Sequence, residues 1–159
     1  MSFDGSCGKT GSGAGVWVHN TETNQAEGHS YKLNFQFTNN ITEYEALLLG
    51  LQLLKKLGAK RIIFHGDFEI VIRHIKGEYI ANHPRLKPYR DDVIDLLKKF
   101  TEYELNFSPR NQNILANGLA FAASACLKPY QRKQYTVQVK YRPTVPHNIK
   151  YLQVFEVYK

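Results

Sequence analysis

The sequence is poor in the features that mark secreted, membrane-spanning or disulfide-stabilised proteins. It has two cysteines, Cys7 and Cys126, which lie 119 positions apart without the spacing of a metal site. It shows no signal-peptide pattern and no apolar run of the length needed to cross a bilayer. Internal repeats and low-complexity segments are also missing. We therefore expect an intracellular protein with reduced thiols and no membrane partner, and the sequence does not decide between nucleus and cytoplasm.

Acidic residues are nearly absent from the last fifth of the chain. Residues 1–127 carry 14 Lys and Arg against 13 Asp and Glu, whereas residues 128–159 carry seven against the single Glu156. At 159 residues and 43% hydrophobic content, the chain is long enough for one domain with a core. We predict a nearly neutral domain over 1–127 and a basic extension over 128–159. Such an extension suits contact with nucleic acid, and a merely solvated tail fits its composition equally well.

Hydrophobic periodicity predicts alternating strands and helices. After a short first strand, strands are expected at 13–20, 27–37, 61–66 and 103–109, and helices at 40–58, 67–77, 89–100 and 113–127. The turn-rich segment 21–25 joins two of the strands into a hairpin, and 134–142 is a candidate for one more strand. Asn117-Gly118 is a turn signal, but the apolar spacing around it favours a helix. This order is typical of an α/β fold, a mixed sheet with helices packed on it.

The glycine-rich stretch 8–15, GKTGSGAG, first suggests a phosphate-binding loop. That motif needs a glycine five positions before Gly8, where the sequence has Phe3. We therefore expect this stretch to be a flexible turn between two strands.

Three acidic residues combine an ordinary structural explanation with a place that suits metal binding. Asp4 stands at the expected end of the first strand, where Asp-Gly alone predicts a turn. Glu43 has capping-box spacing from Asn40, yet it falls on the buried face of its helix. Asp67 lies between a strand and a helix, where an N-cap is the usual explanation. Carboxylates gathered at one edge of a sheet need cations to compensate their charge, and oxygen-only ligands favour Mg²⁺ or Mn²⁺.

Three blocks of the sequence resemble successive blocks of a known family. They are FDGSCG (3–8), TNNITEYEALLLGLQLLKKLGAKRIIFHGD (38–67) and PRNQNILANGLA (109–120). In this order they are similar to type 1 ribonuclease H, most of all to the domain in plant long-terminal-repeat retrotransposons, where it accompanies a reverse transcriptase. The resemblance covers residues 3–127. It implies a mixed five-stranded sheet with flanking helices, and a nuclease that cuts the RNA strand of RNA–DNA hybrids with divalent metal.

The resemblance also implies roles for individual residues. Asp4, Glu43 and Asp67 match the first three catalytic carboxylates, which would hold two Mg²⁺ or Mn²⁺ ions, and Asn117 stands at the fourth acidic position. Thr38, Asn39 and Asn40 match positions near the substrate, and Arg110 matches a basic residue before the last helix. Helix capping by the TNN segment and a solvated loop arginine are the alternative explanations for these four.

Asn117 is the main departure from the family pattern. An amide offers a neutral carbonyl oxygen but removes one negative charge from the metal site. The leading hypothesis is a metal-dependent hybrid endonuclease of retroelement origin, with activity reduced or lost through Asn117. The alternative is a catalytically degenerate domain that binds nucleic acid or a protein partner, and Phe68 beside Asp67 and the short first strand favour it. A resolvase or exonuclease on the same fold is a third hypothesis, which the DGS and TNN segments disfavour.

Overall fold

The computed structural model describes residues 1–8, 11–33, 38–78, 80, 84–125, 130–132, 135–140 and 144. The strands are β1 (Ser2–Gly8), β2 (Gly11–Asn20), β3 (Gln25–Leu33), β4 (Arg61–Gly66), β5 (Glu102–Phe107), β6 (Tyr130–Arg132) and β7 (Tyr135–Lys140). The helices are α1 (Asn39–Lys56), α2 (Glu69–Lys76), α3 (Leu86–Leu97) and α4 (Ile114–Ala125), with a short 3-10 helix, η1 (Arg110–Gln112), before α4. The expected order of strands and helices is confirmed.

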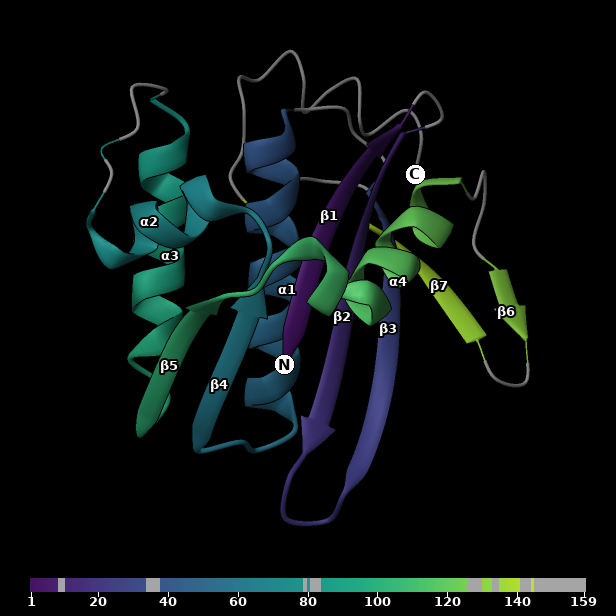
Figure 1. Ribbon diagram of the computed structural model, residues 1–159, viewed down its shortest axis with the longest axis horizontal. Coiled ribbons are helices and arrows are strands. Elements are labelled where there is room, and N and C mark those ends of the chain that lie inside the picture. The colour runs from purple at the N-terminus through teal and green to yellow at the C-terminus, as the bar shows by residue number, and fades with distance from the viewer. Residues whose placement is uncertain are drawn as a thin grey trace.

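The strands form one mixed sheet in the order β5-β4-β1-β2-β3-β7-β6 (Figure 1). β1, β2 and β3 are antiparallel neighbours, whereas β4 runs parallel to both β1 and β5. These five strands are the mixed five-stranded sheet that the sequence predicts. β7 lies within the range given for one more strand and pairs in parallel with β3. β6, which the sequence did not predict, pairs with β7 as an antiparallel neighbour.

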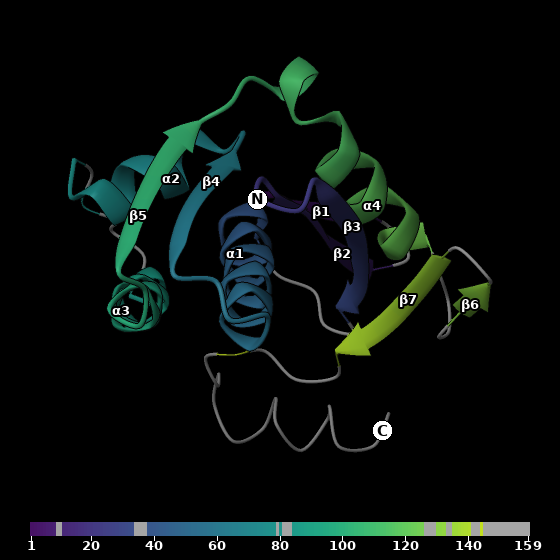
Figure 2. The same cartoon turned by 90° about the horizontal axis from the view of Figure 1, so that it is seen from below.

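Helices cover both faces of the central strands. α1 lies on one face of β1 and β2 and α4 lies on the other (Figure 2). α2 and α3 pack against α1 and against each other. The core is therefore centred between α1 and the sheet, and its largest fully buried side chains include Phe3, Leu33, Tyr44, Leu47, Leu51, Phe64 and Tyr89. α1 buries residues on most of its circumference because the sheet and two helices surround it.

β1 corrects the expectation that Asp4 ends a strand. Asp4 is the third residue of a seven-residue strand, and its register partner on β2 is Gly15. Residues 8–15 were expected to form a turn that leads into the strand predicted at 13–20, but Gly11–Gly15 pairs with β1 throughout. β1 pairs with β4 only through Ser2 and Phe3, so the rest of β1 is open on that side.

Two glycines let the helices lie directly on the central strands. A Cβ atom at Gly5 would stand 2.7 Å from the carbonyl carbon of Thr42 on α1. A Cβ atom at Gly15 would overlap the carbonyl oxygen of Ala116 on α4. Any larger residue at either position would push a helix away from the sheet. Gly5 thereby brings the start of α1 against β1, and Gly15 brings the start of α4 against β2.

Several bounds differ from the expected ones by a few residues. α3 begins at Leu86, before the expected start at 89, because Pro88 is tolerated in a first helical turn. The expected strand residues 34–37 and helix residues 126–127 lie outside the described residues, as does Cys126. Cys7 is exposed, with its Sγ 3.1 Å from the Thr42 hydroxyl oxygen. Within the described part of the chain, no helix has the length and apolar composition to span a bilayer.

Candidate metal centre

Three carboxylates from three separate elements meet beside the middle of the sheet. Asp4 comes from β1, Glu43 from the second turn of α1, and Asp67 from the residue that follows β4. Each offers an oxygen atom, and these atoms all lie within 4.8 Å of one another. Asp4 and Glu43 are buried and Asp67 is half-buried. The structure thus brings together the three acidic residues that the sequence singled out.

The electrostatics of this cluster favour a bound cation. Burial, and then the nearby Asp67 carboxylate, raise the pKa of Asp4 to about 7, while the Arg110 guanidinium opposes the shift. Burial and the Asp4 charge raise the pKa of Glu43 well above its usual range, and a hydrogen bond from the Gly5 backbone N–H opposes it. Close, buried carboxylates cannot all ionise unless positive charge compensates them. A divalent cation would supply that charge.

Glu43 and Asn117 each present a buried oxygen that receives no hydrogen bond from the described residues. These atoms are the Oε2 of Glu43 and the Oδ1 of Asn117. A buried acceptor without a donor is costly, and native proteins rarely leave one without an ion or water to satisfy it. Oxygen atoms of carboxylates and amides are suitable ligands for Mg²⁺ and Mn²⁺. The donor set therefore fits a hard divalent ion.

Asn117 lies in the first turn of α4, so the Asn-Gly pair is inside a helix. Its Nδ2 donates a hydrogen bond of 3.3 Å to the carbonyl oxygen of Arg110, which fixes the amide and leaves Oδ1 as the atom without a donor. The neighbouring residue Ala116 lies over Gly15, the register partner of Asp4. α4 therefore carries Asn117 to the part of the sheet that holds Asp4.

The TNN segment occupies the N-terminal end of α1, the end that also carries Glu43. Thr38 is the N-cap, and its hydroxyl oxygen accepts a hydrogen bond of 3.5 Å from the backbone N–H of Ile41. The capping explanation therefore applies to Thr38, and the capping box between Asn40 and Glu43 is not used. Asn39 is exposed, and the Oδ1 of Asn40 is buried without a donor among the described residues.

Arg110 and Phe68 flank the cluster. Arg110 is exposed at the start of η1, and its positive charge stabilises the ionised form of Asp4. Phe68 is the N-cap residue of α2 and packs against the core, so Asp67 is not a helix cap. The Asp67 carboxylate therefore belongs to the acidic cluster.

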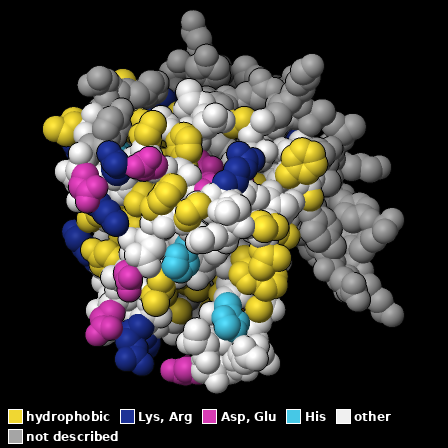
Figure 3. All heavy atoms as spheres, viewed as in Figure 1, with side chains coloured by type: hydrophobic (Ala, Val, Ile, Leu, Met, Phe, Trp, Pro, Cys, Tyr) yellow, Lys and Arg dark blue, Asp and Glu magenta, His cyan; other side chains and the backbone are white. Residues whose placement is uncertain are grey.

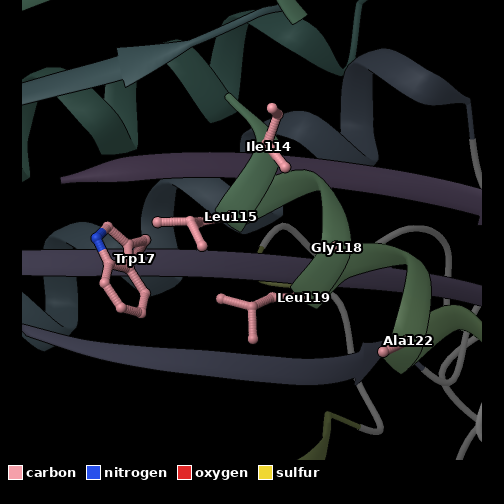
Figure 4. A pocket seen from close by; sticks show the side chains of 6 residues that line it. All are labelled: Trp17, Ile114, Leu115, Gly118, Leu119 and Ala122. Carbon is pink, nitrogen blue, oxygen red and sulfur yellow. The ribbon is translucent and has the colours of Figure 1, made fainter. Parts of the chain in front are cut away.

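The described side chains on one face of the molecule carry charges of both signs (Figure 3). On the face shown in Figure 3, acidic and basic side chains alternate among apolar ones. An apolar groove lies between β2 and the outer face of α4 (Figure 4), lined by Trp17, Ile114, Leu115, Gly118, Leu119 and Ala122. This groove was not predicted from the sequence, although the exposed apolar residues Ile114 and Leu115 of α4 are a signal for it.

A second glutamate of α1, Glu45, is also buried, which was not predicted from the sequence. Glu45 has no exposed surface, and it contacts Tyr89 and Thr144 in place of the acidic cluster. Its signal in the sequence is weak, because residues two apart on a helix point in nearly opposite directions and only one of them was expected to be buried.

Comparison with known proteins covers the part of the chain that contains this cluster. A model of the reverse transcriptase-like family matches residues 2–123. The bifunctional protein Rv2228c of Mycobacterium tuberculosis is 32% identical over 121 residues, which is 73% of this chain and 31% of the relative. The chain therefore spans about a third of the length of this curated relative.

Solved structures share the fold. RNase H1 from the halophilic archaeon Halobacterium salinarum matches with a TM-score of 0.69 and 26% identity, over 77% of this chain and 93% of its own. LC11-RNase H1, solved in complex with an RNA/DNA hybrid, matches with a TM-score of 0.65 and 23% identity, over 76% of this chain and 92% of its own. The second likeness shows the fold alone.

Proposed function

This chain belongs to the reverse transcriptase-like family and has the ribonuclease H fold, and we propose that it is a divalent-metal-dependent endonuclease that cleaves the RNA strand of RNA–DNA hybrids. The observation that carries the proposal is the cluster of Asp4, Glu43 and Asp67, whose oxygen atoms lie within 4.8 Å of one another. The kinship with RNase H1 from Halobacterium salinarum supports the choice of substrate.

In this proposal the three carboxylates hold two Mg²⁺ or Mn²⁺ ions. Asp4 lies within hydrogen-bonding reach of both other carboxylates, so Asp4, Glu43 and Asp67 would hold the ions together. Divalent ions held there would supply positive charge at the phosphate and a more reactive water nucleophile. The protein residues fix the positions of the ions and keep the site partly closed to solvent. The products would carry 3′-hydroxyl and 5′-phosphate ends.

The residues around the cluster would position the hybrid. Asn39 and Asn40 lie beside Glu43 at the start of α1, where amides can contact 2′-hydroxyls in the minor groove. Thr38 remains a proposed contact besides being the N-cap. Arg110 is exposed next to the acidic cluster and is suited to a phosphate contact. The basic residues of 128–159 are proposed to add phosphate contacts, but their side chains lie outside the described residues.

Asn117 favours a second candidate function. It supplies a neutral oxygen where a carboxylate would strengthen cation binding, so a domain that binds hybrids or a protein partner without cutting them is the alternative. Three intact carboxylates with an unsatisfied Glu43 oxygen favour the enzyme. A retroelement origin stays a prediction from the sequence blocks.

A cleavage assay separates the two candidates. The protein is incubated with a hybrid labelled on its RNA strand, in Mg²⁺, in Mn²⁺ and in EDTA, beside an Asp67→Asn variant that keeps the side-chain size. We expect metal-dependent cuts within the RNA strand that EDTA and the variant abolish. Hybrid binding without cleavage in either metal would refute the enzyme and support the binding domain.

A further inference from the structure

α1 carries two buried glutamates that point in different directions. Glu43 and Glu45 are two residues apart, and side chains at this spacing on an α-helix point roughly 200° apart around its axis. Glu43 faces the acidic cluster on β1, whereas Glu45 faces α3. Glu45 has no exposed surface at all and takes no part in the proposed metal site. Its environment therefore needs a separate explanation.

The Glu45 carboxylate is satisfied by donors from two distant parts of the chain. The Tyr89 hydroxyl of α3 donates to Oε1 at 2.5 Å. The backbone N–H of Thr144 donates to the same oxygen at 2.6 Å, and the Thr144 hydroxyl donates to Oε2 at 2.7 Å. Both carboxylate oxygens thus hold Thr144. A buried carboxylate is stable only when charge-assisted hydrogen bonds replace its hydration, so these contacts are strong ones.

Thr144 belongs to the part of the chain beyond the family match, which ends at residue 123. β7 first extends the sheet, with Ser30–Leu33 of β3 in register with Val137–Lys140. In Figure 2 the arrowhead of β7 lies on the side of the sheet that α1 covers. Four residues after β7, Thr144 reaches Glu45. The extension therefore joins the edge of the sheet to α1 through a buried contact.

α1 is held by contacts on two of its sides, and Glu43 lies in the sequence between the residues that make them. On the sheet side, Gly5 allows close contact with Thr42, and its backbone N–H donates to the Glu43 carboxylate. On the other side, the Glu45–Thr144 contact and Tyr89 hold the next turn of the same helix. Because a helix moves as a rigid unit, a displacement of Glu45 would displace Glu43 relative to Asp4 and Asp67.

We propose that Thr144 is a positioning residue for the metal site, which acts by holding Glu45 and through it the helix that carries Glu43. The proposal rests on the proposed function, because it takes the acidic cluster as the metal site. It gives a residue beyond the family match a role in the proposed metal site. Substitutions at Thr144 test the hydroxyl contact with Glu45, because the backbone N–H of residue 144 is present in every variant.

The test compares three variants of the full chain. Thr144→Val removes the hydroxyl at nearly constant volume, Thr144→Ser restores it, and Thr21→Val makes the same change at an exposed turn. Mn²⁺ binding is measured by titration calorimetry, and the protection of α1 amides by hydrogen exchange. We expect Thr144→Val to weaken Mn²⁺ binding by roughly 3–10-fold, which is less than the effect of residues that hydrogen-bond a ligand directly, because Thr144 acts through Glu45. It should also speed exchange in α1, and the other two variants should match the wild type.

Four results would decide against the proposal in different ways. Unchanged Mn²⁺ affinity with a lowered melting temperature would reduce the Thr144 contact to a stabilising one and overturn the positioning role. Equal weakening by Thr144→Val and Thr144→Ser would show that the hydroxyl is not the cause. If the wild type binds no Mn²⁺, the proposed metal site is refuted. Unchanged hydrogen exchange of the α1 amides in Thr144→Val would separately refute the role of the Thr144 hydroxyl in holding α1.

Discussion

The two buried glutamates of α1, Glu43 and Glu45, differ in the groups that surround their carboxylates. Glu45 is 0% exposed, and three hydrogen bonds satisfy its carboxylate. Glu43 is 4% exposed, lies among other carboxylates, and keeps one oxygen without a donor among the described residues. The same side chain at nearly the same depth is thus satisfied in one place and unsatisfied in the other. Hydrogen-bond donors around the carboxylate, and not its burial, therefore distinguish a structural carboxylate from a candidate metal ligand.

The largest expected difference between the two glutamates is in catalysis. We expect Glu43→Gln to lower metal-dependent cleavage of a hybrid by on the order of 10³-fold, because it removes a proposed ligand. Glu45→Gln should cost roughly tenfold at most, less than a change in a residue that hydrogen-bonds a ligand, because Glu45 contacts Tyr89 and Thr144 and none of the three proposed ligands. Initial rates on a labelled hybrid at saturating Mn²⁺ measure both. Equal losses in the two variants would show that the rates follow α1 stability and not metal ligation.

The pH dependence of stability should identify the cluster in the metal-free protein. The folded-state pKa of Asp4, about 7, lies above its value in an unfolded chain, about 4. Between these values the folded protein binds more protons than the unfolded one, so the contribution of Asp4 to stability is full below pH 4 and is lost as the pH rises toward 7. At pH 8 the buried Asp4 is ionised in the metal-free wild type, so the Asp4→Asn variant should have the higher free energy of unfolding.

Urea unfolding in EDTA at pH 5 and pH 8 measures this effect. The stability gap between Asp4→Asn and the wild type should be wider at pH 8 than at pH 5. Mn²⁺ should stabilise the wild type most at the higher pH, because metal and protons compete for the same oxygens. A gap that does not change with pH would mean that the Asp4 carboxyl titrates normally.

Metal-free stability should change in opposite directions in the two glutamine variants. Glu45→Gln should destabilise the fold by about 1–3 kcal/mol, because a neutral amide forms weaker hydrogen bonds with Tyr89 and Thr144 than a carboxylate does, and its Nε2 places a donor against the Thr144 hydroxyl. Glu43→Gln should raise stability, because it removes a charge from a like-charged buried cluster. Thermal melts in EDTA at pH 8 compare the two. If both Glu43→Gln and Glu45→Gln destabilised the metal-free fold, Glu43 would be a structural carboxylate like Glu45.

The smallest expected effect comes from restoring the fourth acid. Asn117→Asp adds a negative charge near Asp4, so Mn²⁺ binding should tighten by about tenfold, or about 1.4 kcal/mol. Asn111→Asp, at an exposed position of η1, adds the same charge without facing β1 and should have a lesser effect. Titration of both variants against the wild type measures the difference. Equal affinities in all three would place residue 117 outside the site.

The fold was predictable where sequence periodicity is strong, and the site where side-chain chemistry is distinctive. The apolar spacing of α1 and the alternation of β2 and β3 mark their elements, and Asp4, Glu43 and Asp67 stand out as acids in or beside apolar segments. The position of Asp4 inside β1 was not predictable, because Gly11, Gly13 and Gly15 of β2, which pair with β1, also favour turns. β6 is three residues long, which is too short for a periodic pattern.

The contact between Glu45 and Thr144 could not be predicted from the sequence for a different reason. The two residues are 99 positions apart, and nothing local to either marks the other. No hydrophobic period around Thr144 predicts that it lies against α1. Long-range hydrogen bonds of this kind depend on topology.

Anomalous diffraction from a crystal soaked in Mn²⁺ would locate the metal among the three carboxylates. We expect manganese density bound by oxygen atoms of Asp4, Glu43 and Asp67, at about 2.0–2.3 Å, the distance expected for hard divalent ions. Density near the Oδ1 of Asn117 would add the amide as a ligand. Manganese bound elsewhere while the three carboxylates remain without an ion would show that they are not the metal site.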